Sequence, residues 1–169
     1  MNKDKIYSVK YESSILESLL YIEDIYSFIR KSLEFINISY PNFESWITKI
    51  FIDTKQIENK ERDIFIIIDE ENKKISGLMV LKLSSLENKI CTLVIFPEYR
   101  NKGLASLLIN LALSKSKKEL TLTVSENKFL MFKKLLDKFG FNIIKEDYIY
   151  NEAEKELFLS TYNKKAKYE

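Results

Sequence analysis

The chain has 169 residues, of which 46% are hydrophobic and 31% are charged, and its formal net charge is +2. These values predict one soluble globular domain and give no support to a nucleic-acid partner held by phosphate neutralisation. No apolar run reaches the length of about eighteen residues that spans a bilayer, and no signal-peptide pattern opens the chain, so no membrane partner is expected.

The first sixty residues predict a strand followed by two helices. Residues 6–11 have the pattern of a strand, and residues 13–32 predict a helix that is capped by its first two serines and has a broad apolar face. A break at residues 40–42, Tyr-Pro-Asn, precedes a second helix over residues 43–52. The aromatic residues of this second helix, Trp46 among them, could line an acceptor groove, but their helical spacing favours core packing.

From residue 62 the pattern becomes that of strands. Residues 63–69 form an apolar run bounded by charges, and a polar turn at residues 70–73 leads into a strand that ends at Leu83. Residues 84–89 form another polar turn, which leads into a strand over residues 90–96. Because no crossover helix separates these three strands, they are predicted to form an antiparallel meander.

The remaining residues alternate between helices and strands. A helix is expected from about Gly103, a strand over residues 120–124, a helix over residues 126–139, and two strands over residues 141–150 and 154–162. The predicted order is therefore a strand, two helices, three strands, a helix, a strand, a helix and two strands.

The most informative stretch joins the strand at residues 90–96 to the helix that begins near Gly103. A helix N-terminus at the end of a strand presents unpaired N–H groups and the positive end of the peptide dipoles, which suits a phosphate or pyrophosphate. Arg100 and Lys102 add full positive charges beside it. Gly103 is one of only three glycines in the chain, and its missing side chain lets a ligand approach the backbone.

This stretch resembles the acetyl-CoA signature of the GNAT N-acetyltransferase superfamily, which is Gln or Arg, two residues, Gly, one residue, then Gly or Ala. Residues 100–105, RNKGLA, match it, and residues 97–99, PEY, are the usual lead-in. Residues 135–141, LLDKFGF, resemble the later family helix that ends in Gly-Phe, and Gly77 lies in a strand where the family often has a glycine. The resemblance covers residues 62–160, and the first sixty residues match only in the order of their elements.

The resemblance implies an α/β fold of the α+β type, with a mixed, mostly antiparallel central sheet of about seven strands flanked by about four helices. Residues 1–169 would form one domain. Residues 1–60 would supply the first strand and the acceptor-side helices, residues 62–126 the sheet and the acetyl-CoA-binding core, and residues 127–162 the last helix and hairpin.

The resemblance also implies an activity, the transfer of an acetyl group from the co-substrate acetyl-CoA to a primary amine of a small molecule, peptide or protein. In the family, the amine attacks directly in a ternary complex, the fourth and fifth strands splay apart to admit the pantetheine arm, and homodimers are common. The residues that would bind acetyl-CoA are Leu93, Val94 and Ile95 at the pantetheine arm, Arg100, Asn101, Lys102, Gly103, Leu104, Ala105 and Ser106 at the pyrophosphate, and Asn127 as the pantetheine-binding asparagine.

The chain departs from the family at the two positions that usually transfer protons. The position of the catalytic glutamate falls on Cys91, and the position of the tyrosine acid falls on Leu136. The sequence has no histidine, which removes the commonest general base and metal ligand, so no metal is expected. Cys91 without a histidine partner is expected to be a small buried hydrophobic residue, and a lone cysteine favours a cytoplasmic location.

Four residues could substitute in proton transfer. Glu87, in the turn before the central strand, and Glu126, just after the fifth strand, could relay a proton through water. Tyr148 or Tyr150 could donate a proton to the leaving sulfur. Alternatively, the two glutamates are solvated residues of turns, and strand tyrosines usually serve in packing.

Two other functions stay open at this stage. A catalytically degenerate acyl-CoA-binding sensor or regulatory module would keep the cofactor loop without the proton-transfer residues. A plain α/β interaction domain would have the turn by coincidence.

Overall fold

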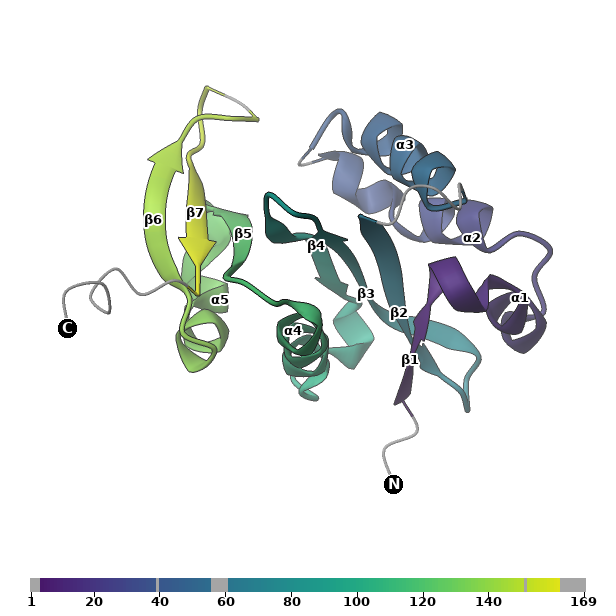
Figure 1. The fold of residues 1–169 in the computed structure, drawn as a ribbon. Coiled ribbons are helices and arrows are strands. Elements are labelled where there is room, and N and C mark those ends of the chain that lie inside the picture. Colours follow the sequence, from purple (N-terminus) through teal and green to yellow (C-terminus); the bar gives the residue numbers. More distant parts are fainter. Residues whose placement is uncertain (1–3, 39, 56–60, 151, 162–169) are drawn as a thin grey trace.

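The computed structural model of this chain describes residues 4–38, 40–55, 61–150 and 152–161. Its centre is a seven-stranded sheet of order β1-β2-β3-β4-β5-β7-β6 (Figure 1). Only β4 and β5 pair in parallel, and the other neighbours are antiparallel, so the mixed sheet expected from the resemblance is confirmed. The strands are β1 (Asp4–Ser8), β2 (Arg62–Asp69), β3 (Lys74–Leu83), β4 (Asn88–Ile95), β5 (Leu120–Ser125), β6 (Asn142–Asp147) and β7 (Glu156–Ser160).

Helices cover both faces of the sheet. On one face, α1, α2 and α3 pack against β2 and β3 around buried residues such as Ile29, Ile47 and Ile66. On the other face, α4 and α5 pack around Leu108, Leu136 and their neighbours. The helices are α1 (Val9–Leu20), α2 (Ile25–Ser32), α3 (Phe43–Lys55), α4 (Leu104–Lys115) and α5 (Glu126–Lys138), with short 3₁₀ helices η1 (Glu34–Ile38) and η2 (Pro97–Tyr99).

The predicted helix over residues 13–32 is wrong in its continuity, because the chain forms two helices there, α1 and α2. Tyr21 takes the left-handed conformation with φ 55°, which ends α1, and the Ile22 N–H donates back to the Glu17 carbonyl at 3.0 Å. Asp24 then caps α2 by accepting from the Tyr26 N–H at 3.0 Å. The described residues therefore contain five α-helices rather than about four.

The start of the chain also differs from the prediction of a strand over residues 6–11. β1 covers Asp4–Ser8, and α1 begins at Val9. Ser8 is the cap of α1, rather than Ser13 or Ser14: its hydroxyl oxygen accepts from the Tyr11 N–H and its hydroxyl donates to Asp63 on β2. Because β1 pairs with β2 up to Ser8, the cap is anchored by the sheet as well as by the helix.

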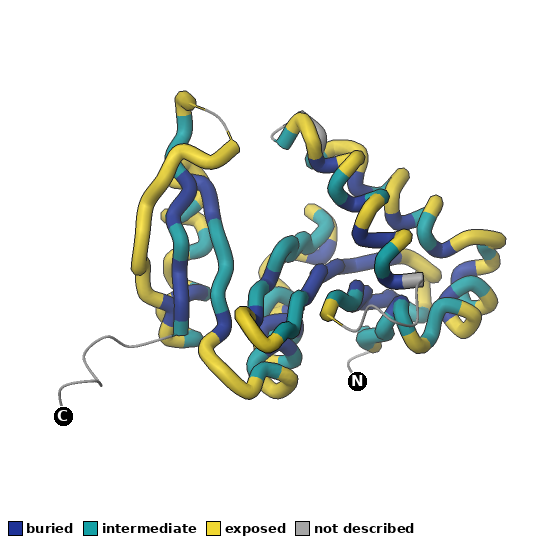
Figure 2. Tube along the Cα trace, turned by 45° about the horizontal axis from the view of Figure 1, so that its top comes forward, coloured by how far each residue is buried: buried dark blue, intermediate teal, exposed yellow. Residues whose placement is uncertain are grey.

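The three central strands form the predicted antiparallel meander, and β2 and β3 are buried along most of their length. The last hairpin is shorter than expected, since β6 ends at Asp147 and β7 begins at Glu156. Tyr162, the predicted end of the last strand, lies outside the described residues. β6 is an exposed edge strand (Figure 2), because only β7 pairs with it.

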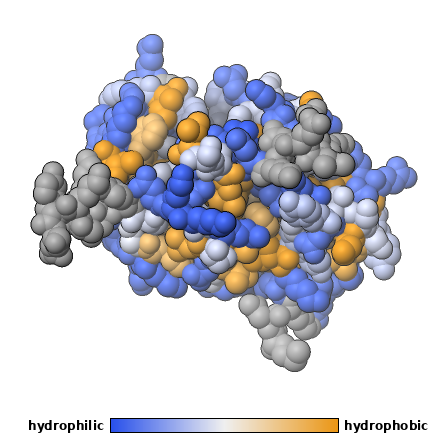
Figure 3. All heavy atoms as spheres, viewed as in Figure 1, coloured by the Kyte–Doolittle hydropathy of each residue, from blue (hydrophilic) through white to orange (hydrophobic). Residues whose placement is uncertain are grey.

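Hydrophobic and hydrophilic side chains are interspersed on the face seen in Figure 3. Trp46 is partly buried against the cluster that α1, α2 and α3 form with the sheet, as the helical spacing of the aromatic residues predicted. Among the residues that the structure describes, no helix combines the length and the apolar character needed to cross a membrane.

Candidate acetyl-CoA and acceptor site

The two parallel strands of the sheet pair over only three residues. Asn88, Lys89 and Ile90 of β4 pair with Leu120, Thr121 and Leu122 of β5. Beyond Ile90 the two strands part, although β4 continues to Ile95 and β5 to Ser125. We call this end of the two strands the open end, and the end at Asn88 the paired end.

A β-bulge marks the point where the strands part. Val80 of β3 pairs with Thr92, whereas the next residue, Leu81, pairs with Ile90, so Cys91 is the extra residue of the bulge. A bulge bends its strand and increases the local twist. It therefore turns β4 away from β5 immediately after their last shared pair.

Backbone N–H groups of β4 face the space between the parted strands. The Phe96 N–H donates to the Ser76 carbonyl of β3 at 3.1 Å, and antiparallel pairs alternate between hydrogen-bonded and unbonded. The N–H groups of Leu93 and Ile95 therefore turn away from β3. They are fixed donors of the kind that can polarise a thioester carbonyl and stabilise an oxyanion.

The turn after β4 has the backbone geometry of an anion site. Asn101 and Gly103 both take left-handed conformations, with φ 60° and 82°. Gly103 precedes α4, and no side chain caps the first turn of that helix. Left-handed residues directly before a helix N-terminus orient successive N–H groups toward one point, which suits a pyrophosphate.

Cations surround this turn. Arg100 donates from Nε to the Ile95 carbonyl at 3.1 Å, which ties the turn to the open end of β4. Lys102 Nζ lies 5.2 Å from the centre of the Tyr99 ring. Lys138 Nζ, at the end of α5, donates to Ser106 Oγ at 3.4 Å. Lys138 is therefore a third cation near the turn, and the sequence motif did not indicate it.

The other residues expected to bind acetyl-CoA lie around this region. Leu93 and Ile95 pack partly buried against the cluster of α4 and α5, whereas Val94 packs toward α1, α2 and α3. Leu104 is buried, and Ala105 follows it in the first turn of α4. Asn127 lies in the first turn of α5, and its backbone N–H donates to Glu154 Oε1 at 3.3 Å.

The two positions that usually transfer protons in the family hold residues unsuited to it. Leu136 is buried in the cluster under α5. Burial raises the pKa of the Cys91 thiol, and a thiol so shifted is a weak nucleophile and a poor source of thiolate at neutral pH.

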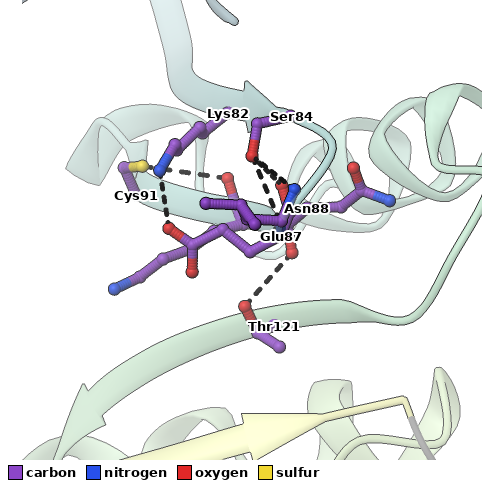
Figure 4. Close-up of polar contacts among 8 residues, drawn as sticks. Lys82, Ser84, Glu87, Asn88, Cys91 and Thr121 are labelled. Carbon is purple, nitrogen blue, oxygen red and sulfur yellow. Dashed lines mark hydrogen bonds and ion pairs between the residues drawn. The ribbon is translucent and has the colours of Figure 1, made fainter.

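Glu87 lies at the paired end of β4, away from the open end (Figure 4). Its carboxylate forms an ion pair with Lys82 Nζ at 2.8 Å, and this hydrogen bond is the main reason why the pKa of Glu87 lies below its ordinary value. Thr121 Oγ1 donates to the Asn88 carbonyl at 3.1 Å beside it and helps to hold the paired strands together.

Glu126 and Tyr148 lie toward the open end, but both are exposed. Glu126 begins α5 directly after β5, and its N–H donates to the Lys155 carbonyl at 2.9 Å. Tyr148 follows β6, and Lys155 Nζ lies 6.0 Å from the centre of its ring. The structure therefore does not bring Glu87, Glu126 and Tyr148 together.

A different group of residues meets at the open end of β5, on the sheet face that carries α1, α2 and α3. Glu156 of β7 pairs directly with Ser125 of β5 and is only 4% exposed. Tyr40, before α3, donates its hydroxyl to Glu156 Oε1 at 3.4 Å. The Tyr150 ring packs edge-on against the Tyr40 ring, with centroids 5.3 Å apart. We call Tyr40, Ser125, Tyr150 and Glu156 the open-end cluster.

The open-end cluster perturbs the acid–base properties of its members. Burial, together with the nearby Glu154, raises the pKa of Glu156 above its ordinary value. Burial and the charge of Glu156 raise the pKa of Tyr40 to about 12. Sequence reasoning missed Glu156, Ser125 and Tyr40; the only signal was a charged residue directly before the short apolar run at residues 157–159.

The fold is similar to that of several acetyltransferases of known structure. A GNAT-family acetyltransferase from Bacillus cereus superposes with a TM-score of 0.60 at 18% identity, over 93% of this chain and 95% of that one. A spermidine N-acetyltransferase chimera from Vibrio cholerae and hSSAT superposes with a TM-score of 0.60 at 17% identity, over 94% of this chain and 95% of that one.

A third similar structure, from Bacillus anthracis, was solved in complex with acetyl coenzyme A. Its TM-score is 0.54 at 23% identity, over 63% of this chain and 65% of that one. At such identities these likenesses show the fold alone. No curated protein sequence matches the chain.

The sequence itself supplies the family assignment. The model of the Acetyltransferase (GNAT) family matches residues 23–141, which include β2, β3, β4, the turn at Gly103 and α5. Together with the parted parallel strands and the left-handed turn before α4, this match shows that the chain belongs to the GNAT acetyltransferase family.

Proposed function

We propose that this protein is an N-acetyltransferase that moves an acetyl group from acetyl-CoA to a primary amine. The observation that carries the proposal is the juxtaposition of two features: N–H donors of β4 that β5 does not pair with, and the left-handed turn before α4 that follows the same strand. The first suits a thioester and the second suits a pyrophosphate, and both are parts of one elongated substrate.

Residues of the turn would hold the pyrophosphate. The backbone N–H groups from Asn101 to Ser106 would donate to it, and Arg100, Lys102 and Lys138 would balance its charge. Leu93, Val94 and Ile95 would contact the pantetheine arm, and the Leu93 and Ile95 N–H groups would donate to the thioester carbonyl. Asn127 would bind the same arm from the start of α5.

The amine nitrogen would attack the polarised carbonyl directly. An alkylammonium with a pKa near 10.4 must first lose a proton, which costs roughly 4.6 kcal/mol at pH 7. Of the residues expected from the sequence to transfer protons, Glu126 and Tyr148 lie toward the open end, whereas Glu87 lies at the paired end and would act only through a chain of water. The CoA thiolate, with an ordinary thiol pKa near 8.5, leaves without much help from an acid.

The proposal is tested by thermal unfolding with and without acetyl-CoA, followed by turnover with a panel of amines. Acetyl-CoA at one hundred times its dissociation constant should stabilise the protein by about 2.7 kcal/mol, which raises the melting temperature by roughly 5 to 11 °C. Gly103→Glu should remove this shift, because a carboxylate would occupy the pyrophosphate position. Absence of any shift with acetyl-CoA, CoA or longer acyl-CoAs would overturn the proposal.

A second function is favoured by one observation: neither Cys91 nor Leu136 can transfer protons as the usual family residues do. We therefore also propose, as the alternative, an acyl-CoA-binding sensor that has lost catalysis. Tight acetyl-CoA binding with no acetylation of any amine in the panel would select this alternative over the enzyme.

A further inference from the structure

We infer that the open-end cluster is the acceptor site of this enzyme, in which Glu156 binds the ammonium group of an aliphatic amine and takes up its proton. This inference rests on the proposed acetyltransferase function. It assigns the acceptor class and names residues that the family motif does not indicate.

The position of Glu156 along the sheet favours this role. β4 and β5 pair in the register Ile90 with Leu122, and continuing that register, with Cys91 as the extra residue of the bulge, places Ser125 near the level of Val94, between the Leu93 and Ile95 N–H donors. Glu156 lies directly opposite Ser125, on the neighbouring strand. The carboxylate is therefore level with the β4 donors that would hold the thioester, on the far side of the parted strands.

The face of the sheet is the right one for an acceptor. Val124 packs into the cluster under α4 and α5, and strand side chains alternate between faces. Thr123 and Ser125 therefore point to the opposite face, and so does Glu156, because directly opposed residues of paired strands share a face. Acetyl-CoA held at α4 and an amine held at Glu156 would thus approach the open end from opposite sides.

A buried hydroxyl without a partner marks the same place. Ser125 is 4% exposed, and among the described residues its Oγ is a buried side-chain oxygen with no hydrogen-bond partner. Ser125 also precedes α5 without capping it. Native proteins rarely leave a buried hydroxyl unpaired, so an ammonium N–H donor beside Glu156 would satisfy it.

Two tyrosine side chains lie beside the Glu156 carboxylate. Tyr40 contacts Glu156 through its hydroxyl and Tyr150 through its ring, and Tyr150 forms a side-chain hydrogen bond with Thr123. Aromatic faces attract ammonium groups, so these rings favour a cationic acceptor beside the carboxylate.

The protein's own lysine shows that an ammonium can occupy this surface. Lys128 Nζ lies 5.6 Å from the centre of the Tyr40 ring, and its charge, like that of Lys89, lowers the pKa of Glu156 against the larger effect of burial. An incoming acceptor would compete with Lys128 for the ring and for the carboxylate. Replacement of Lys128 by a neutral residue should therefore strengthen acceptor binding rather than weaken it.

The chemical step balances within this site. One N–H bond of the ammonium breaks and an O–H bond forms on Glu156, which leaves a lone pair on nitrogen. That pair forms the C–N bond to the acetyl carbon, and the C–S bond breaks with its electron pair left on the CoA sulfur. The nitrogen, now bonded to the acetyl carbon, loses a second proton through water to the CoA thiolate, which gives the neutral amide and the CoA thiol, while Glu156 returns the first proton to solvent.

The experiment compares wild-type protein, Glu156→Gln and Lys128→Met by calorimetric binding of 1,4-diaminobutane in the presence of CoA, and by the acceptor KM. Glu156→Gln should weaken amine binding and raise the acceptor KM by about 10- to 100-fold, as expected for loss of a charged hydrogen bond. Lys128→Met should strengthen amine binding and lower the acceptor KM, each by about two- to fivefold. Glu146→Gln, on exposed β6, is the matched control and should change neither.

Each outcome decides the inference. A thermal shift with acetyl-CoA that is unchanged in Glu156→Gln, combined with lost amine binding, supports it. Equal amine binding by wild-type protein and Glu156→Gln overturns it, and so does a wild-type protein that binds no diaminobutane. Amine binding without any acetylation would instead overturn the proposed enzymatic function and leave the amine site in place.

Discussion

Tyr99 donates its hydroxyl to Asp69 Oδ2 at 3.2 Å, and this bond joins the start of the turn before α4 to the last residue of β2. The two residues are 30 positions apart, and both are buried. The turn is thus held by the sheet on one side and, through Arg100 and Ile95, by β4 on the other.

Tyr99→Phe should therefore loosen the turn without unfolding the protein. In this variant Asp69 Oδ2 still accepts from Asn72 Nδ2 at 2.7 Å. The free energy of unfolding should therefore fall by only about 1 kcal/mol, which lowers the melting temperature by roughly 2 to 4 °C. Acetyl-CoA affinity, measured calorimetrically, should also fall. Tyr21→Phe is the control, since Tyr21 is 86% exposed, and an equal loss in both variants would contradict the role of the bond.

Asp69 should contribute to a loss of stability in acid. The Asn72 side chain, together with backbone N–H groups and Tyr99, holds the pKa of Asp69 below its ordinary value. A carboxylate with a lowered folded pKa stabilises the fold above its unfolded pKa, and that contribution disappears as the pH falls through the folded pKa. Between pH 7 and pH 3 the free energy of unfolding, measured with urea, should decline less in Asp69→Asn than in the wild-type protein. An identical decline would contradict this assignment.

Gly103→Ala should separate backbone strain from ligand binding. An added Cβ would meet no protein atom within 4 Å, but the residue has φ +82°, so alanine there costs about 1 to 2 kcal/mol. Gly140 has φ +74°, the same open surroundings and a position after α5, so Gly140→Ala should cost about as much. Only Gly103→Ala should weaken acetyl-CoA binding, as titration calorimetry would measure. Equal affinities in the two variants would place the pyrophosphate elsewhere.

Glu156→Gln should increase stability while it reduces activity. Burial raises the folded pKa of Glu156, so its ionised form is unfavourable in the folded protein. Below the unfolded pKa the carboxyl is protonated in both states and carries no penalty. As the pH rises through the unfolded and then the folded pKa, wild-type stability is lost but the glutamine variant loses none of it. Melting temperatures at pH 4 and pH 8 should diverge in favour of Glu156→Gln at the higher pH. A variant less stable than the wild-type protein at pH 8 would identify Glu156 as a structural residue instead.

The local sequence pattern was enough to predict the central meander and the turn before α4. β2, β3 and β4 follow one another with short polar connections, so their apolar runs and turn residues specify both the strands and their antiparallel pairing. The turn at Gly103 is equally local, because the glycine, the preceding strand and the following helix all lie within residues 88–115. Boundaries were predicted less well wherever a cap replaced an expected continuation, as at Tyr21 and Ser8.

The residues of the candidate acceptor site could not be predicted from the sequence, because they meet only in the folded chain. The bulge at Cys91 exists because β3 and β4 pair in two registers, and the parting of β4 from β5 depends on where their shared ladder ends. Tyr40 and Glu156 are 116 residues apart and meet because η1 and α3 lie on the same face of the sheet as the open end of β5. Such contacts depend on strand register and on which face each helix covers, and neither is written in the local pattern of hydrophobic residues.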